Sequence, residues 1–384
     1  MWKKKSLFQI LNNHAIDYPT PINFTYFNGY GFLLVLAFVI QIITGVFLAM
    51  HYAPHVDLAF ASVEHIMRDV NNGWLMRYIH ANGASFIFIF LYIHMARGLY
   101  YSSYTSPRHW LWITGVVIFL LSIITAFLGY VLPWGQMSFW AATVIINILG
   151  AIPVLGDPIT ELLWGGFAVD NATLNRFFSL HYLMPFVIVG LMGLHLVLLH
   201  NAGSGNPLGI DSRTNNLPFY PYFVVKDFFG FFIYLAFFFA FVCFAPNYLG
   251  HTDNYIPANA LVTPAHIVPE WYLLPFYAIL RSIPDKLLGV IAMGVSIVGL
   301  IALPFLIPTK NIRSSMFKPL TRKLFWLFSA NFIVLIWIGG QVAEEPYITI
   351  GQVATAFYMA YIFILLPLVT KLEVYLLSIG DQIN

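Results

Sequence analysis

Residues 77–97 read RYIHANGASFIFIFLYIHMAR. The stretch is apolar over most of its length and carries His80 and His94 fourteen positions apart. In an α-helix, 14 residues rise about 21 Å and end roughly 40° short of four full turns, so the two histidines share one face. A second stretch, residues 181–195, reads HYLMPFVIVGLMGLH and has a histidine at each end with the same spacing. The sequence therefore predicts two helices that each present a pair of histidines at equal separation.

The composition is that of a membrane protein. The 384 residues are 60% hydrophobic and only 9% charged, and the mean hydropathy is +0.78. A soluble domain of this length needs more charge on its surface. The net charge of +2 gives no indication of nucleic-acid binding. Cys243 is the only cysteine, which excludes an internal disulfide, an iron–sulfur cluster held by this chain and c-type haem attachment. Residues 1–28 lack the pattern of a cleaved signal, so we expect them to be retained.

Eight apolar segments predict an all-α integral membrane protein with eight transmembrane helices. Long apolar runs favour helices over a barrel, which requires alternation. The segments cover residues 31–52, 77–101, 111–132, 178–200, 228–246, 287–307, 324–340 and 352–370.

The first four predicted helices are expected to form a bundle within residues 1–210, and the last four helices lie within residues 211–384. The connection 133–176 is rich in Gly, Pro and Trp, and its apolar pieces are too short to span a membrane. We expect short interfacial or re-entrant helices there. A second long connection, 247–286, contains Pro264, Pro269, Pro275 and Pro284.

Lysines and arginines are distributed unevenly between the two sides of the membrane. One side, which the positive-inside rule makes the negative (N) side, collects Lys3, Lys4, Lys5, Arg97, Arg108, Arg213, Lys226, Lys310, Arg313, Lys318, Arg322, Lys323 and Lys371. The positive (P) side collects Arg68, Arg77, Arg176, Arg281 and Lys286. With eight crossings, both termini are expected on the N side and both long connections on the P side.

The predicted second and fourth helices run parallel because the crossings alternate in direction. Parallel helices set His80 level with His181 near the P side, and His94 level with His195 near the N side. Two facing imidazoles suit the axial positions of a haem iron, whereas a zinc site needs three or four clustered protein ligands. A proton-relay transporter without haem, or a subunit whose histidines only pack, remains an alternative.

Glycines on the two other helices of the bundle repeat the 14-residue spacing, as Gly31 and Gly45 and as Gly115 and Gly129. Glycine permits close approach in a membrane and here favours flat macrocycles over bare ions. Arg77 and Arg97 each lie three residues from a histidine, where a guanidinium could bind a haem propionate. The alternative for each arginine is an interface anchor.

These residues resemble the mitochondrial cytochrome b family, the core subunit of ubiquinol:cytochrome c oxidoreductase (respiratory complex III). The resemblance covers essentially the whole chain. It rests on the four histidines with their glycines, GYVLPWGQMS at 129–138, RYIHANGAS at 77–85 and PEWY at 269–272. It implies two haem b groups with bis-histidine ligation, a low-potential haem on the P side and a high-potential haem on the N side.

The resemblance also implies a quinol-oxidation site on the P side, between the connection 133–176 and residues 269–272. Glu270 is then the acceptor of a quinol proton, and Tyr130 and Tyr272 line the pocket. Independently of the family, a carboxylate between proline and aromatic residues at a membrane face indicates proton handling. The alternative for Glu270 is a surface or helix-start acid.

On the N side, the resemblance implies a quinone-reduction site formed by His200, Ser204, Asn206, Lys226 and Asp227. A helix-start ion pair is the alternative for the last two. Ala141 departs from the glycine usual in the family, and the hypothesis is normal turnover with weak binding of strobilurin-type inhibitors. The remaining histidines are expected at surfaces or interfaces: His14, His51, His55, His65, His109, His251 and His266.

The implied activity is that of the catalytic subunit of a proton-translocating quinol:cytochrome c oxidoreductase. Ubiquinol is oxidised on the P side, one electron crosses through the two haems, and quinone is reduced on the N side (a Q-cycle). The implied partners are the Rieske iron–sulfur protein, cytochrome c1, other complex III subunits, phospholipids and a second copy of the complex. The implied location is the mitochondrial inner membrane, with both termini in the matrix.

Overall fold

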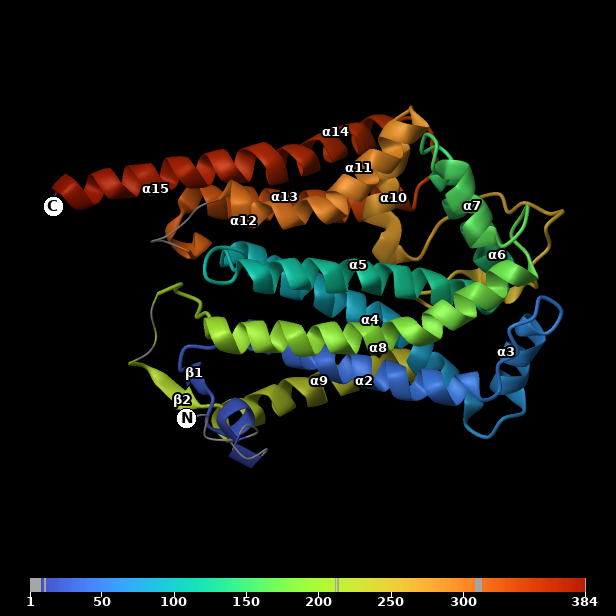
Figure 1. The fold of residues 1–384 in the computed structure, drawn as a ribbon, viewed down its shortest axis with the longest axis horizontal. Coiled ribbons are helices and arrows are strands. Elements are labelled where there is room, and N and C mark those ends of the chain that lie inside the picture. Colours follow the sequence, from blue (N-terminus) through green and yellow to red (C-terminus); the bar gives the residue numbers. More distant parts are fainter. Residues whose placement is uncertain (1–7, 10–11, 211, 213, 308–312, 384) are drawn as a thin grey trace.

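The computed structural model describes residues 8–9, 12–210, 212, 214–307 and 313–383 (Figure 1). Within these residues, eight helical segments are long and apolar enough to cross a membrane, which confirms the predicted fold class. Their helices are α2 (Tyr30–Ala49), α4 (Gly73–Tyr100), α5 (His109–Val131), α8 (Asn171–Ala202), α9 (Tyr222–Phe244), α11 (Lys286–Val298) with α12 (Leu303–Leu306), α13 (Pro319–Gly339), and α14 (Tyr347–Ala360) with α15 (Leu366–Ile383).

Several helices begin earlier than predicted, and the first turns of α8 and α13 are polar. Helix α8 begins at Asn171, seven residues before the predicted start at 178. The Asp170 backbone N–H donates to the Thr173 hydroxyl over 3.1 Å, so this start is capped by polar groups that a search for apolar runs cannot find. Helices α9, α13 and α14 also begin five or six residues early.

The connections contain four short helices. Helices α6 (Gln136–Leu149) and α7 (Gly156–Trp164) confirm the short helices expected between 133 and 176. Helices α3 (Ala59–Arg68) and α10 (Leu274–Ser282) were not predicted. Strands β1 (Pro19–Pro21) and β2 (Asn216–Pro218) form a small antiparallel pair that was also not predicted.

Helix packing groups five of the described spans with three. Helix α2 packs against α4, and α5 against α8. Helix α9 lies on α2 and α4, where Phe86 meets Tyr234 and Phe238. The fifth span therefore packs with the first bundle, because the aromatic side chains of α9 fill its outer groove. Helix α10 packs against α11, α13 and α14.

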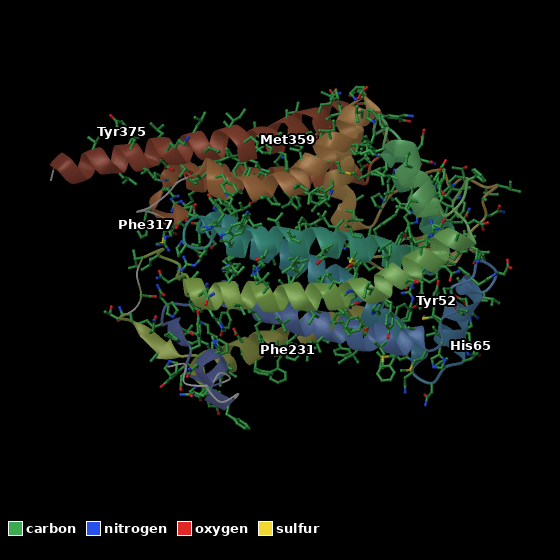
Figure 2. All side chains as sticks on the ribbon, viewed as in Figure 1. Tyr52, His65, Phe231, Phe317, Met359 and Tyr375 are labelled. Carbon is green, nitrogen blue, oxygen red and sulfur yellow. The ribbon has the colours of Figure 1, made fainter. Side chains whose placement is uncertain are left out.

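The outward faces of the spans are apolar. Side chains cover every helix surface in Figure 2, and exposed hydrophobic residues lie on α9, α13 and α15. Phe237 and Trp326, for example, are 65% and 63% exposed. In water such surface is costly, whereas in a bilayer it faces acyl chains.

Both termini lie at one end of the bundle, here called the terminal end, and α3, α6 and α7 lie at the opposite end (Figure 1). This agrees with eight crossings.

Lys318, one of the basic residues assigned to the N side, is fully buried, and its Nζ donates to the Ser102 hydroxyl over 3.4 Å. Burial lowers the pKa of Lys318 to about 8. Lys3–Lys5, Arg213 and Lys310 lie outside the described residues.

Candidate functional site

Helices α4 and α8 run in the same direction, and their histidines meet in two pairs. The ring centroids of His80 and His181 are 6.2 Å apart, and those of His94 and His195 are 6.5 Å apart. Two metal–imidazole bonds of about 2 Å, with roughly 1.1 Å from each bonding nitrogen to its ring centre, place two centroids about 6.3 Å apart. Each pair therefore has the separation of two axial ligands on one metal ion.

The protein supplies two ligands at each depth and no more. No cluster of three or more His, Cys, Asp or Glu residues occurs among the residues that the structure describes. A bare zinc ion would lack ligands here, whereas a porphyrin brings four nitrogens of its own. The donor set therefore fits haem.

Three of the four candidate histidines donate through Nδ1, which leaves Nε2 for a metal. The His80 Nδ1 lies 3.0 Å from the Thr44 hydroxyl, and the His195 Nδ1 lies 3.0 Å from the Thr114 hydroxyl. Both hydroxyls donate to carbonyls of their own helices, so they accept from the imidazoles. His181 Nδ1 donates to the Thr125 carbonyl over 2.8 Å. Such second contacts fix the tautomer of a ligating histidine.

His94 is the exception. The Arg97 guanidinium donates to His94 Nδ1 over 3.3 Å, which places the ring proton on Nε2. If iron binds at Nε2, the ring proton moves to Nδ1, and Arg97 must then stop donating to Nδ1. Arg97 Nε is buried without a hydrogen-bond partner, so the guanidinium retains donors for an anionic group such as a propionate.

The four glycines lie against the four histidine rings. A Cβ atom added at Gly31 would lie 3.5 Å from His94 Cε1, and one at Gly115 would lie 3.2 Å from His195 Cε1. The corresponding neighbour of Gly45 is His80, at 3.0 Å. At Gly129, the added atom would overlap the ring of His181. The glycine spacing thus matches the histidine spacing because each glycine makes room for one ligand ring.

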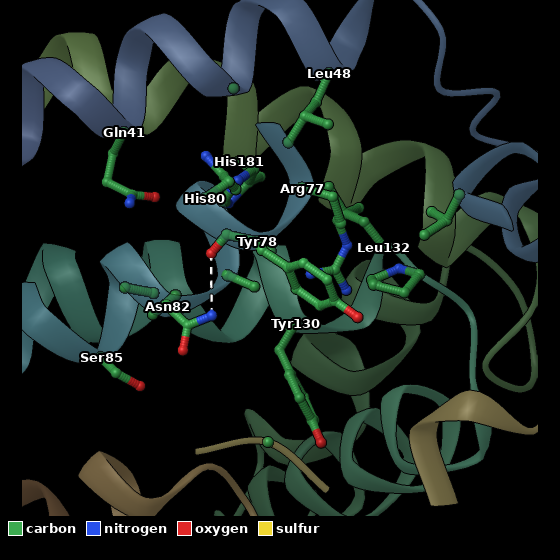
Figure 3. Close-up of a pocket in the computed structure, with 18 of the residues that line it drawn as sticks. Gln41, Leu48, Arg77, Tyr78, His80, Asn82, Ser85, Tyr130, Leu132 and His181 are labelled. Carbon is green, nitrogen blue, oxygen red and sulfur yellow. Dashed lines mark hydrogen bonds between the residues drawn. The ribbon is translucent and has the colours of Figure 1, made fainter. Parts of the chain in front are cut away.

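A cavity of about 310 Å³ opens beside the pair at the opposite end. Its lining includes His80, His181, Arg77 and Tyr130 (Figure 3), and it extends to Glu270 and Tyr272. The expected haem ligands and the expected quinol-site residues of the P side therefore share one continuous space.

Glu270 lines this cavity. Burial raises the pKa of Glu270 to about 7, and this shift is opposed by a hydrogen bond from Tyr130 and by the charge of Arg77. The carboxyl therefore changes protonation near neutral pH, as a proton acceptor must. Glu270 is half-buried here and also begins the short helix η4 (Trp271–Leu273), so its role as proton acceptor stays a prediction.

Helix α4 also holds the segment that carries Glu270. The Trp271 indole N–H donates to the Ser85 hydroxyl over 3.0 Å, and the Tyr272 ring stacks on Phe88 with centroids 4.1 Å apart. The Tyr92 hydroxyl donates to the Tyr272 carbonyl. Helix α4 thus carries His80 and His94 on one face, and a different face of the same helix holds residues 271–272 of the cavity wall in place.

Candidate residues at the terminal end contact the segment that precedes α2. His200 contacts His14 and Tyr18, and the Tyr18 hydroxyl lies 3.2 Å from Ser204 Oγ. Lys226 donates to the Phe24 carbonyl and lies over the Tyr26 ring.

The structure speaks against the helix-start ion pair that was the alternative for Lys226 and Asp227, and the quinone-site role of these residues and of Asn206 stays a prediction. Among the described residues, the salt bridges pair His55 with Asp57, His65 with Asp69 and Arg68 with Glu64, and none joins Lys226 to Asp227. Asn206 is buried and bonds within its own loop, to Ile210 O and Leu208 N. It therefore holds the loop in place in this structure.

Comparison with known proteins agrees with this geometry. Residues 15–203 match the family described as Cytochrome b/b6/petB, and residues 257–359 match Cytochrome b(C-terminal)/b6/petD. The chain belongs to the cytochrome b family. It is 61% identical to cytochrome b of Chondrus crispus, over 98% of both chains. It is 62% identical to that of Marchantia polymorpha, over 98% of this chain and 92% of the relative.

A chain of a solved structure titled Hyperthermophilic respiratory Complex III shares the fold. The TM-score is 0.90 at 35% identity, and the match covers 96% of this chain and 98% of the other. The predicted resemblance to the cytochrome b of respiratory complex III is thereby confirmed. As a cytochrome b, the chain is a multi-pass membrane protein of electron transport, and the family implies binding of haem b.

Several residues that build this cytochrome b site were missed in the sequence. Thr44 and Thr114 directly precede Gly45 and Gly115, so the repeated Thr-Gly dipeptide could have identified them. His14 is exposed, in agreement with the expected surface or interface position, but its contact with His200 was not predicted, nor was the place of His251 in the cavity lining. Ala141 is buried on α6 and is not among the residues that line the cavity, so its effect on inhibitors stays a prediction.

Proposed function

We propose that this chain is the di-haem subunit that oxidises ubiquinol at its opposite end and reduces quinone at its terminal end. The observation that carries the proposal is the pair of bis-histidine sites at two depths between parallel helices. One of these sites shares a cavity with Glu270. The expected division at residue 210 is also part of this proposal. Residues 1–210 carry all four histidines proposed to bind haem, and α9, which follows residue 210, packs on their helices without adding a ligand.

His80 and His181 would hold one haem, and His94 and His195 the other. When bound, the two haems supply a one-electron path between the ends of the bundle. Arg77 and Arg97 provide cations for the propionates. The glycines allow the ligand rings to approach the neighbouring helices, and the threonines orient those rings.

At the cavity, Glu270 accepts a proton from the bound quinol. The hydrogen bond from Tyr130 orients its carboxyl, and the aromatic wall around Tyr272 excludes water. Removal of the proton favours loss of an electron, because the deprotonated quinol is the stronger reductant. The second electron leaves to a partner, the Rieske iron–sulfur protein, since a single cysteine cannot hold such a cluster.

At the terminal end, His200, Ser204, Lys226 and Asp227 supply the polar groups for quinone reduction. His200 and Ser204 contact His14 and Tyr18, and Lys226 contacts Phe24 and Tyr26, so both groups pack on the segment that precedes α2. Asn206 contributes by fixing the loop after α8. Protons are taken up at this end and released at the other.

The terminal end is proposed to face the mitochondrial matrix, because the larger number of lysines and arginines belongs to that end. Moving one charge across the whole membrane against its potential costs about 2.3 kcal/mol per 100 mV. The haem at the terminal end therefore needs the higher potential. Cytochrome c1, further subunits and a second copy of the complex complete the proposed assembly.

Spectroscopy of the purified complex tests the proposal. Optical and paramagnetic spectra should count two low-spin bis-histidine haems on this chain, and a redox titration should separate them. Replacement of His94 or His195 should remove only the higher-potential component. One haem or none, or equal potentials, would refute the di-haem path.

A further inference from the structure

The N-terminal segment covers His200 with a second histidine. His14 Nδ1 lies 2.9 Å from His200 Nδ1, and the rings stack with centroids 4.9 Å apart and 11° between their planes. The Tyr18 ring lies 4.3 Å from the His200 ring on the same segment. His200 is therefore held between groups that precede the first membrane span.

Backbone hydrogen bonds fix this segment in place. Thr20 is buried and pairs with Leu217 in the β1–β2 ladder. The Phe219 N–H donates to the Tyr18 carbonyl over 3.0 Å, and the Tyr220 N–H donates to the Ile16 carbonyl over 3.1 Å. The segment is thus anchored to the chain that leads into α9 and its Lys226–Asp227 pair.

The contact between the two Nδ1 atoms limits the charge of the pair. One nitrogen must donate and the other must accept, because two protonated rings would place two donors and two positive charges face to face. Among the charged side chains, Arg108 donates to the Gly203 carbonyl, three residues after His200, and Asp17 accepts from Asn12 on the segment that carries His14. The pair therefore holds one shared proton between the rings, and His14, which is exposed, can exchange protons with water.

We propose that His14 and His200 form a proton relay that supplies one of the two protons of quinone reduction. The inference rests on the proposed quinone site. His200 Nε2–H gives its proton to a quinone carbonyl oxygen as that quinone takes one electron from the transmembrane path, which forms an O–H bond. The proton on His14 Nδ1 moves to His200 Nδ1, so the N–H bond broken at His200 Nε2 is replaced by one at Nδ1 and the His200 ring stays neutral.

The relay then resets after the product leaves. The Nδ1 proton of His200 returns to His14, and His200 Nε2 takes a proton from water. No other group gains or loses charge in the cycle. Tyr18 contributes by holding the His200 ring and Ser204 together.

The test compares His14→Phe, which keeps the stacked ring and removes the transferable proton, with the native complex in its membrane. We expect reoxidation of the terminal-end haem by quinone to slow about tenfold or more. The slowing should carry an altered pH profile and a larger solvent isotope effect in D2O. Quinol oxidation at the cavity should keep its native rate. The matched control is His65→Phe, at an exposed histidine of the opposite end.

His14→Gln provides a second variant with a polar group that does not titrate, in case the phenyl ring disturbs the segment and the haem spectra change. Native rates and an unchanged pH profile in both His14 variants would overturn the relay. His200→Phe separates the two proposals. If it also leaves reoxidation unchanged, the quinone site itself is wrong, whereas an effect of His200→Phe alone refutes only the relay.

Discussion

Adding one methyl group at each of the four bundle glycines should damage the two haem sites in a graded order. The distance from the added Cβ to Cε1 of the facing ring is 3.5 Å at Gly31, 3.2 Å at Gly115 and 3.0 Å at Gly45. At Gly129 the new atom overlaps the ring of His181. Alanine at Gly31 makes an ordinary contact, whereas alanine at Gly129 forces the ring or the helix to move.

The expected magnitude follows from this crowding. Overpacking a well-filled interior costs typically about 1–3 kcal/mol, which corresponds to roughly a five- to 150-fold loss in affinity. Gly129→Ala should reach the upper part of this range and Gly45→Ala the lower part, both at the haem held by His80 and His181. Gly115→Ala should weaken the other haem slightly, and Gly31→Ala should have almost no effect.

Reduced-minus-oxidised spectra of the purified complex, resolved by redox titration, measure the two haems separately. Gly129→Ala should lose most of the lower-potential signal and keep the other signal. The matched control is Gly190→Ala on α8, because no heavy atom lies within 4 Å of the position of its added Cβ. Retention of both signals in Gly129→Ala, or a larger loss in Gly31→Ala, would refute the reasoning.

Four further substitutions test the cavity and the ligand contacts. Quinol oxidation should rise with pH through about 7, because Glu270 accepts a proton only when it is deprotonated, and Glu270→Gln should lower the rate roughly 100-fold and flatten its pH profile. An identical pH profile in this variant would exclude the role. Thr44→Val should weaken only the lower-potential haem, and Thr114→Val only the higher-potential haem, by about 10- to 100-fold in a haem-retention assay. Equal loss of both haems in either variant would contradict this assignment. Ser85→Ala removes the partner of the Trp271 indole and should raise the KM for quinol several-fold, by roughly 1 kcal/mol, with little change in kcat, and an unaltered KM would count against a positioning role for this contact.

Much of the haem-site arrangement could be predicted from the sequence, because helix geometry is local and regular. The rise and turn of an α-helix place His80 with His94 on one face, and the parity of eight crossings places His80 opposite His181. The spacing of the four glycines was also visible in the sequence, where it was interpreted as space for flat macrocycles. The glycines make room for the histidine rings themselves.

Contacts between distant segments could not be predicted in this way. The five-and-three grouping of the helices depends on how the aromatic residues of α9 fit the groove between α2 and α4. The buried position of Lys318, the Trp271–Ser85 hydrogen bond and the meeting of His14 with His200 join residues far apart in the chain. No local period encodes such contacts, because they depend on how the whole bundle packs.

The sequence by itself therefore determined the membrane class, the eight spans and the four histidines at two depths, since each follows from hydropathy or from the fixed geometry of one helix. Only the tertiary structure decided the cavity that joins His80 to Glu270 and the placement of the N-terminal segment on His200. Both depend on the packing of loops against helix ends, where side-chain shape and backbone pairing act together across the chain.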